Sequence, residues 1–221
     1  MDVCVVTYRN DADRIRRRLR PTDHLLLWDN TTKNAGFAAG ANAAARRGQH
    51  PLIAFVNPDG DPAPDCFAAL EAALDDPSVV AVEASQGEEW DRPALNARGD
   101  MEWISGACMV VRREAFERVG GFDERLFMYC EDVDLSYKLS RHGCLRHCAT
   151  ARFHHPGKSR PMRALHRNYR NWLVIQRRHR RADPARMLRD ALWSLRQGQH
   201  EEAAARLTGL ADYALRARRW A

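Results

Sequence analysis

Apolar positions in the first 160 residues gather in short runs that alternate with amphipathic segments. The runs are often β-branched and bounded by polar residues, as buried strands are; they lie at 3–8, 25–28, 52–56, 78–82, 103–111 and 145–153. Apolar residues three and four positions apart in the intervening segments indicate helices. Alternating strands and helices predict an α/β fold with a mixed, mostly parallel sheet flanked by helices.

After Pro161 the pattern becomes helical, with expected helices at 164–181, 184–197 and 201–220. Asp183 followed by Pro184 is a start signal for the middle helix, because proline is favoured in the first helical turn. The sequence therefore predicts an α/β domain over residues 1–160 and a C-terminal helical extension, packed on it, over residues 161–221.

Charge is distributed unevenly between these two parts. Residues 1–151 carry a formal net charge of −6 and residues 152–221 carry +12, which together give the +6 of the whole chain. A basic extension suggests an anionic partner, although an arginine-rich solvated helix face would look the same. Nucleic acid is disfavoured because no nucleic-acid-binding motif is present. A peripheral contact with an anionic membrane, or with a diphosphate-linked acceptor, fits better.

The sequence also bears on the compartment in which the protein works. No apolar run approaches the ~20 residues that a membrane-spanning helix needs. The chain opens on a strand pattern and lacks the segments of a secretory signal. The six cysteines show no disulfide framework spacing, so free thiols are expected. These features predict a cytoplasmic location, with possible peripheral attachment to a membrane.

Polar clusters follow three of the expected strands. In largely parallel sheets, ligands bind beyond the carboxyl ends of the strands. One fold would bring the three clusters to a single edge, which makes their members candidate ligand-binding residues: Thr7, Tyr8, Asp29, Asn30 and Asn57. Gly36 joins them because its small-residue loop permits close approach of the backbone to a ligand, although the loop is too generic to count as a phosphate-binding motif.

Two acids and a histidine could bind a metal. Asp59 and Asp61 lie two residues apart in a Gly/Pro loop and could hold Mg²⁺ or Mn²⁺ through oxygen, although the same residues also make ordinary turns. His154 follows the last strand and could complete the coordination. Beyond it, Lys158 and Ser159 could contact phosphate oxygens, or the segment could be a plain surface loop.

A zinc site is an alternative interpretation of the same region. Cys144, Cys148 and His154, with a further histidine nearby, offer suitable ligand types. A strand would point alternate residues to opposite faces, which argues against this set.

Three acids cluster at the expected start of a helix that ends near Gly143. Asp132 would lie where the helix dipole favours its ionised form, as a general base requires. Glu131 lies beside it, and Asp134 is better placed to pair with Lys138 one turn later. The alternative is that acids simply enrich first helical turns.

A small-residue segment within the expected strand at 103–111 marks a place where a substrate or another backbone could approach. Ser105 and Gly106 provide the space. Trp103 beside them could stack on a sugar ring or fill the core, and the sequence does not decide between the two.

Taken together, these segments resemble family-two glycosyltransferases of the GT-A fold, in particular the bacterial rhamnosyltransferase-like branch. The resemblance covers roughly residues 3–175. Its most specific part is GGFDE at 120–124 followed by FMYCEDVDL at 127–135; the other matching pieces are VVTY at 5–8, DN at 29–30, NAGFAAGAN at 34–42, VNPD at 56–59, ISGACMVVRR at 104–113 and HHPGKS at 154–159.

The resemblance implies a Rossmann-like, nucleotide-diphospho-sugar transferase domain over residues 1–160 and an inverting transfer that depends on Mg²⁺ or Mn²⁺. The sugar, with rhamnose as the first candidate, would pass from a dTDP- or UDP-sugar to a hydroxyl of a glycan, a lipid-linked sugar or a small natural product. The implied roles are catalysis for Asp132 and Glu131, metal binding for Asp59, Asp61 and His154, donor binding for Thr7, Tyr8, Asp29, Asn30, Gly36, Asn57, Lys158 and Ser159, and acceptor binding for Trp103, Ser105 and Gly106.

The sequence departs from this family in two places, one of which is the short stretch between Val82 and Trp103. Only Thr31, Thr32 and Lys33 separate Asp29-Asn30 from Asn34, where family members usually carry a further helix and strand. The alternative function is therefore a shortened, non-catalytic relative that binds a nucleotide or a partner.

Overall fold

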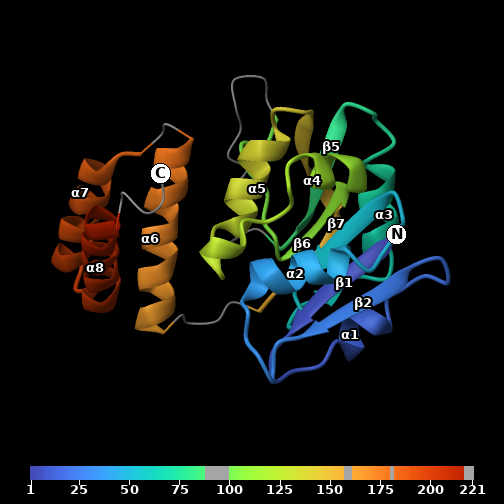
Figure 1. The fold of residues 1–221 in the computed structure, drawn as a ribbon, viewed down its shortest axis with the longest axis horizontal. Helices are drawn as coiled ribbons and strands as arrows, with labels where there is room; N and C mark the ends of the chain where they lie inside the picture. The colour runs from blue at the N-terminus through green and yellow to red at the C-terminus, as the bar shows by residue number, and fades with distance from the viewer. Residues whose placement is uncertain (88–99, 157–160, 180–181, 217–221) are drawn as a thin grey trace. The chain divides into compact units, whose positions relative to one another are not determined.

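The computed structural model describes residues 1–87, 100–156, 161–179 and 182–216. The chain divides into two compact units (Figure 1). The first unit comprises residues 1–127 and 131–156, and the second comprises residues 128–130 and 157–221. Lys158 and Ser159 lie outside the described residues.

A mixed sheet forms the centre of the first unit. Its described strands are β1 (Asp2–Thr7), β2 (His24–Asp29), β3 (Leu52–Val56), β4 (Asp61–Pro62), β5 (Val79–Ser85), β6 (Cys108–Arg112) and β7 (Cys144–His154). They are arranged in the order β2-β1-β3-β6-β5-β7-β4. β1 runs parallel to β2 and β3, and β5 runs parallel to β7. β6 is antiparallel to both of its neighbours, and β4 is antiparallel to β7. The sheet is mixed as expected, but less dominated by parallel pairs.

Helices cover both faces of this sheet, as α/β layer folds require. The helices of this unit are α1 (Asp13–Arg16), α2 (Phe37–Ala45), α3 (Cys66–Ala72), α4 (Arg113–Arg118), the 3₁₀ helix η1 (Glu124–Leu126) and α5 (Glu131–Leu139) (Figure 1). One core cluster packs α1 and α3 against the sheet, and a second packs α2, α4 and α5. Val3 and Val5 of β1 belong to the first cluster, whereas Cys4 and Val6 belong to the second. Burial on both faces explains why the strands are almost continuously apolar in sequence.

The expected strand at 103–111 is shorter in the structure. Only Cys108–Arg112 forms β6, and the residues that precede it form a loop. Ser105 and Gly106 direct their backbone N–H groups to the carboxylates of Glu83 and Asp132 instead of to a neighbouring strand. These side-chain acceptors therefore replace the strand ladder over this segment.

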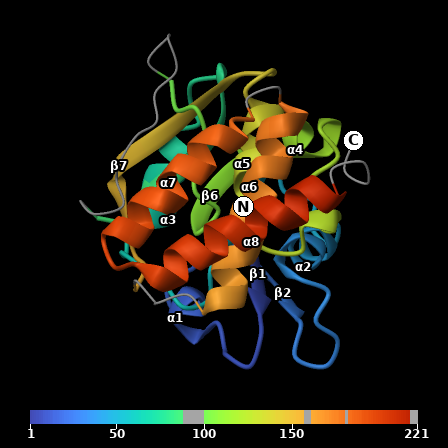
Figure 2. The ribbon, with the colours of Figure 1, turned by 90° about the vertical axis from the view of Figure 1, so that its left-hand side faces the viewer.

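The second unit contains α6 (Met162–Arg178), α7 (Pro184–Arg196) and α8 (His200–Arg216). α8 packs against both other helices, and α7 and α8 lie side by side (Figure 2). Asp183 caps α7 by accepting a hydrogen bond from the Arg186 backbone N–H at 2.8 Å, which confirms the start signal. Asn171 of α6 donates from its amide to the carbonyls of Met128 and Tyr129. Nowhere in the described residues is a helix long and apolar enough to cross a membrane.

Candidate functional site

The carboxyl ends of three strands meet at one edge of the sheet. Thr7 and Asp29 are register partners at the ends of the parallel strands β1 and β2, and Asn57 directly follows β3. The Asn57 backbone N–H donates to the carbonyl of Ala107 at 2.8 Å. The loop before β6 therefore lies at the same edge as the candidate ligand-binding residues. Tyr8, the residue after β1, is exposed there.

Asp29 presents a carboxylate at this edge. Its Oδ1 accepts a hydrogen bond from the Thr31 backbone N–H at 2.8 Å. Hydrogen bonding from Thr31 holds the pKa of Asp29 below its usual range. Asp29 is therefore an ionised, exposed acceptor for a donor group of a ligand.

Asn30 and Gly36 stabilise the backbone at the same edge of the sheet. Asn30 is buried; its Oδ1 accepts from Trp28 Nε1 at 3.1 Å, and its Nδ2 donates to the Gly36 carbonyl at 2.9 Å. Gly36 has φ of +89°, and a Cβ there would lie 2.4 Å from the Phe127 carbonyl oxygen. These contacts fix the short loop between β2 and α2 and require glycine at position 36.

The structure brings Asp59 together with His155. His155 Nε2 lies 3.2 Å from Asp59 Oδ1 and 3.4 Å from Asn57 Nδ2. His154 instead pairs with Asp61 across β4 and β7. His155 was missed at the level of sequence, although the adjacent His-His pair was a signal, because neighbouring residues near a strand end point to opposite faces.

Asp61 has a different electrostatic partner. Its Oδ1 lies 3.6 Å from Arg18 Nε. The structure therefore does not join Asp59, Asp61 and His154 into one cluster; in the described part of the chain, the group of three metal-ligand side chains with mutually close ligand atoms is Asp2, His24 and His50. The zinc alternative with Cys144 and Cys148 is likewise absent from the clusters of described residues.

The residues around Asp59 fit a hard divalent cation. Mg²⁺ is usually held by one or two carboxylates and takes further ligands from water and substrate phosphates. Asp59 offers a partly exposed carboxylate and His155 a partly exposed ring nitrogen. This incomplete protein ligand set is what a site shared with a diphosphate requires.

Asp132 lies in the first turn of α5 with its carboxylate held by two backbone groups. Oδ2 accepts from Gly106 N–H at 2.9 Å, and Oδ1 accepts from Val133 N–H at 2.9 Å. Hydrogen bonds to a carboxylate favour its ionised form. The Asn57–Ala107 contact and the Gly106–Asp132 contact together connect the end of β3 to the start of α5.

Glu131 differs from its neighbour in its environment. Burial and the nearby charge of Asp132 raise the pKa of Glu131 to about 8. Its Oε2 is buried and has no hydrogen-bond partner among the described residues. The raised pKa favours the protonated form of Glu131 near neutral pH, which makes it a poorer candidate for the base than Asp132. Divergent environments for adjacent carboxyl groups are a common way to separate acid and base roles.

We expect Glu131 to make stability depend on pH. A carboxyl with a raised pKa in the folded state stabilises fully below its ordinary value of 4.5, and this contribution disappears as pH rises through about 8. The free energy of unfolding of the wild type should fall relative to that of Glu131→Gln over this window. Urea denaturation at pH 5, 7 and 9 measures the difference, and parallel pH profiles for the two proteins would contradict it.

Glu83 is a functional candidate that the sequence interpretation missed. It is a buried acid on β5, and burial raises its pKa. Its Oε2 accepts from Ser105 N–H at 2.5 Å, and its Oε1 lies 3.0 Å from His147 Nδ1. Glu83 thus fixes the loop that carries Gly106. A single charged residue inside the apolar run of β5 was the available signal.

Two further residues of this loop are partly accessible. Trp103 and Ser105 are half-buried. The Ser105 hydroxyl accepts from Ala107 N–H at 3.3 Å, and Ser136 Oγ of α5 accepts from Ile104 N–H at 3.1 Å. The loop is therefore tied to α5 next to Asp132.

The mixed sheet, covered by helices on both faces and with acids beyond the ends of its strands, has the GT-A class of glycosyltransferase fold. The chain belongs to the family described as Glycosyl transferase family group 2, whose profile matches residues 89–215. The prediction from the sequence that the chain is a family-two glycosyltransferase with the GT-A fold is confirmed.

Curated relatives match over short segments. The chain is 63% identical over 43 residues to N-acetylglucosaminyl-diphospho-decaprenol L-rhamnosyltransferase of Mycobacterium tuberculosis, which covers 20% of this chain and 14% of that protein. It is 48% identical over 54 residues to Rhamnosyltransferase WbbL of Escherichia coli, covering 24% of this chain and 20% of the relative. The matches thus span less than a quarter of either relative's length.

Solved structures share the fold across more of the chain. The mannosyltransferase PcManGT from Pyrobaculum calidifontis, in complex with GDP-Man and Mn²⁺, aligns with a TM-score of 0.67 at 18% identity, over 98% of this chain and 74% of that one. GalNAc-T7 with UDP, GalNAc and Mn²⁺ aligns with a TM-score of 0.61 at 12% identity, over 80% of this chain and 47% of that one.

Proposed function

We propose that the chain is a metal-dependent, inverting glycosyltransferase that moves a sugar from a nucleoside-diphosphate sugar to an acceptor hydroxyl. The observation that carries the proposal is the continuous set of contacts from the Asp59–His155 pair through Asn57, Ala107 and Gly106 to Asp132. These contacts connect the Asp59–His155 pair, where a metal ion and the donor diphosphate would bind, to the Asp132 carboxylate. The M. tuberculosis and E. coli relatives are named as rhamnosyltransferases, so dTDP-rhamnose is the first donor to test.

In this mechanism the residues of the chain bind, orient and move a proton. Asp132 accepts the proton of the acceptor hydroxyl as that hydroxyl attacks the anomeric carbon opposite the leaving diphosphate, and one such displacement inverts the configuration. Gly106 N–H and Val133 N–H hold the carboxylate for this transfer. A divalent ion held by Asp59 and His155 would supply charge neutralisation for the leaving diphosphate.

The donor and acceptor sides are assigned by position. Thr7, Tyr8, Asp29 and Asn57 lie at the edge where the nucleotide would bind, with Asn30 and Gly36 shaping its loop. Gly106 contacts Asp132, and Trp103 and Ser105 of the same loop would bind the acceptor with it. Glu131, whose raised pKa favours its protonated form, would donate a hydrogen bond near the acceptor and would not serve as the base.

The domain assignment follows from the same proposal. Residues 1–160 would form the catalytic domain, and the basic helices beyond residue 161 would bind an anionic membrane surface or a diphosphate-linked acceptor. Cosedimentation of the full chain with vesicles containing or lacking an anionic lipid tests this part separately. Equal binding to both vesicles would contradict it.

The proposal is tested by incubating the full chain with Mn²⁺ and a panel of dTDP-, UDP- and GDP-sugars, and measuring release of the nucleoside diphosphate. We expect turnover with one donor class, which chelation by EDTA abolishes. Binding of a donor without even slow hydrolysis would favour the second candidate, a non-catalytic binding module. The short connection between β2 and α2 is the feature that favours that candidate.

We expect Gly106→Ala to lower kcat without changing donor affinity. A Cβ at this position would lie 3.1 Å from Asp132 Cβ and 3.4 Å from its Oδ2. The carboxylate would have to move by a few tenths of an ångström, and small displacements of a reacting group are costly, so a loss of about tenfold is expected. Steady-state kinetics with the active donor measures it. An unchanged kcat in a variant with wild-type Tm would contradict the positioning of Asp132.

A further inference from the structure

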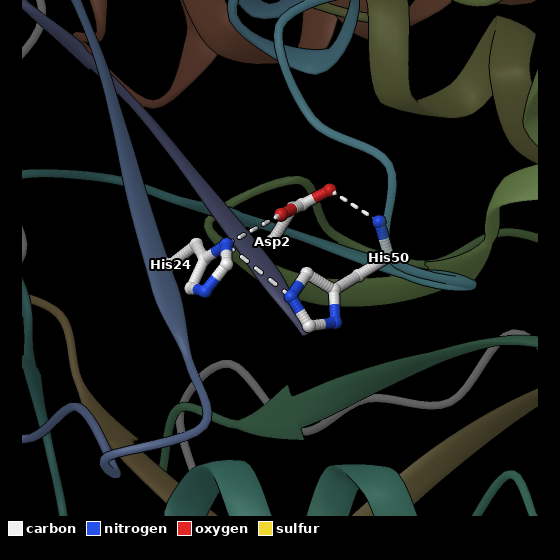
Figure 3. A group of neighbouring side chains, drawn as sticks. All are labelled: Asp2, His24 and His50. Carbon is white, nitrogen blue, oxygen red and sulfur yellow. Dashed lines mark hydrogen bonds and ion pairs between the residues drawn. The ribbon is translucent and has the colours of Figure 1, made fainter.

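Three side chains from separate segments meet at the opposite end of β1 and β2 from the candidate active site. Asp2 begins β1, His24 begins β2, and His50 lies in the loop before β3 (Figure 3). One ligand-type atom from each lies within 4.8 Å of the other two. All three belong to the first unit of the chain.

The two histidines have the separation that a tetrahedral metal site imposes. His50 Nε2 lies 3.3 Å from His24 Nδ1. Zinc–nitrogen bonds of about 2.0–2.1 Å in tetrahedral geometry place two ligand nitrogens about 3.3 Å apart. Without an ion, one of these rings must donate an N–H to the other, so a cation would satisfy both lone pairs at once.

Asp2 provides an oxygen that lacks another partner. The residue is 1% exposed, and its Oδ1 is a buried atom without a hydrogen-bond partner among the described residues. Such an atom costs free energy unless something satisfies it. Oδ1 lies 3.9 Å from His24 Nδ1, and the His24 side chain is 64% exposed. A small rotation of the solvent-facing His24 ring would bring its Nδ1 closer to Asp2 Oδ1, so that both atoms could bind the same ion.

Neighbouring groups fix the positions of Asp2 and His50 through hydrogen bonds. Asp2 Oδ2 accepts from Arg113 Nη2 at 2.7 Å and from the His50 backbone N–H at 2.9 Å. Arg113 Nε also donates to the His50 carbonyl at 2.6 Å. These contacts occupy Oδ2 and leave Oδ1 facing the histidines. Outer contacts of this kind orient the ligands of a metal site.

We propose that Asp2, His24 and His50 form a zinc-class metal site, separate from the diphosphate site of the proposed reaction. Imidazole nitrogens with one carboxylate favour zinc over magnesium or calcium. The exposure of His24 leaves one side open, so water would fill the fourth position. The ion would connect β2 and the loop before β3 to the start of β1.

The test uses the full chain stripped of metal with EDTA and titrated with ZnCl₂ by calorimetry. We expect one Zn²⁺ to bind per chain, with affinity lowered at least about tenfold in His24→Ala and in His50→Ala. Zn²⁺ at about 100 times its Kd should raise the Tm of the wild type by roughly 5–10 °C, but not that of either variant. Circular dichroism establishes that both variants are folded.

Two matched controls separate this site from others. His142→Ala removes an exposed histidine elsewhere on the same unit, and Asp59→Ala removes the candidate diphosphate-site ligand; both should bind Zn²⁺ as the wild type does. Equal affinity in the wild type and both histidine variants, or no binding at all, would overturn the proposal. So would a thiolate charge-transfer band in the Co²⁺-substituted protein, because it would assign the ion to cysteine ligands.

Discussion

Replacing Asp132 by asparagine should lower kcat for sugar transfer by about 10²–10⁴-fold while leaving donor affinity close to that of the wild type. Asparagine has nearly the same shape, but its amide cannot accept the acceptor proton. The loss corresponds to roughly 3–5 kcal/mol of transition-state stabilisation. Single-turnover kinetics and calorimetry with the donor measure the two quantities separately.

The hydrogen bonds of Asp132 make a folding control necessary. Gly106 and Val133 donate to different oxygens of its carboxylate. Asparagine keeps only one of these acceptors, so one donor loses its partner at a cost of about 1–3 kcal/mol. A lower Tm with retained donor binding is therefore expected. Full turnover by Asp132→Asn would refute the assignment of the base.

The second large effect is expected for Asp59→Ala, which should weaken Mn²⁺-dependent donor binding by at least about tenfold, or 1.4 kcal/mol. The substitution removes the carboxylate that lies 3.2 Å from His155 Nε2. In EDTA the wild type and the variant should bind the donor equally weakly. Calorimetry with and without Mn²⁺ therefore distinguishes loss of a metal ligand from general damage to the donor pocket.

The chain supplies matched controls for this experiment. Asp61→Ala removes a carboxylate two residues away that faces Arg18, and His154→Ala removes the neighbour of His155. We expect both variants to retain Mn²⁺-dependent binding, and His155→Ala to lose it. If Asp61→Ala and His154→Ala caused the loss instead, the ligand set expected from the sequence would be right and the one favoured by the structure wrong.

Much of the fold was predictable because strands buried on both faces appear in the sequence as continuous apolar runs. The alternate residues of β1 pack into opposite core clusters, and this requires a continuous apolar run. The positions of Thr7, Asp29 and Asn57 followed from where such runs end. The role of the segment at 103–107 was not predictable in the same way, because its backbone donates to side chains instead of a strand.

The site was harder to predict where partners come from distant segments. Sequence spacing identified two adjacent histidines, but only the pairing of β4 with β7 places His154 opposite Asp61 and leaves His155 for Asp59. Glu83 contacts Ser105 and His147, which lie 22 and 64 residues further along the chain. No local pattern encodes such contacts, because topology and register create them.

The register of β1 with β2 separates the proposed zinc site from the edge of the sheet at which the donor is proposed to bind. Asp2 pairs with His24 at one end of this ladder and Thr7 pairs with Asp29 at the other. Five residue-to-residue steps of about 3.3 Å each place the two ends roughly 17 Å apart, about twice the screening length of physiological salt. Zinc and manganese could therefore be loaded in either order with little mutual repulsion. Contaminating zinc in a purified sample would raise its thermal stability without indicating whether the donor side is loaded.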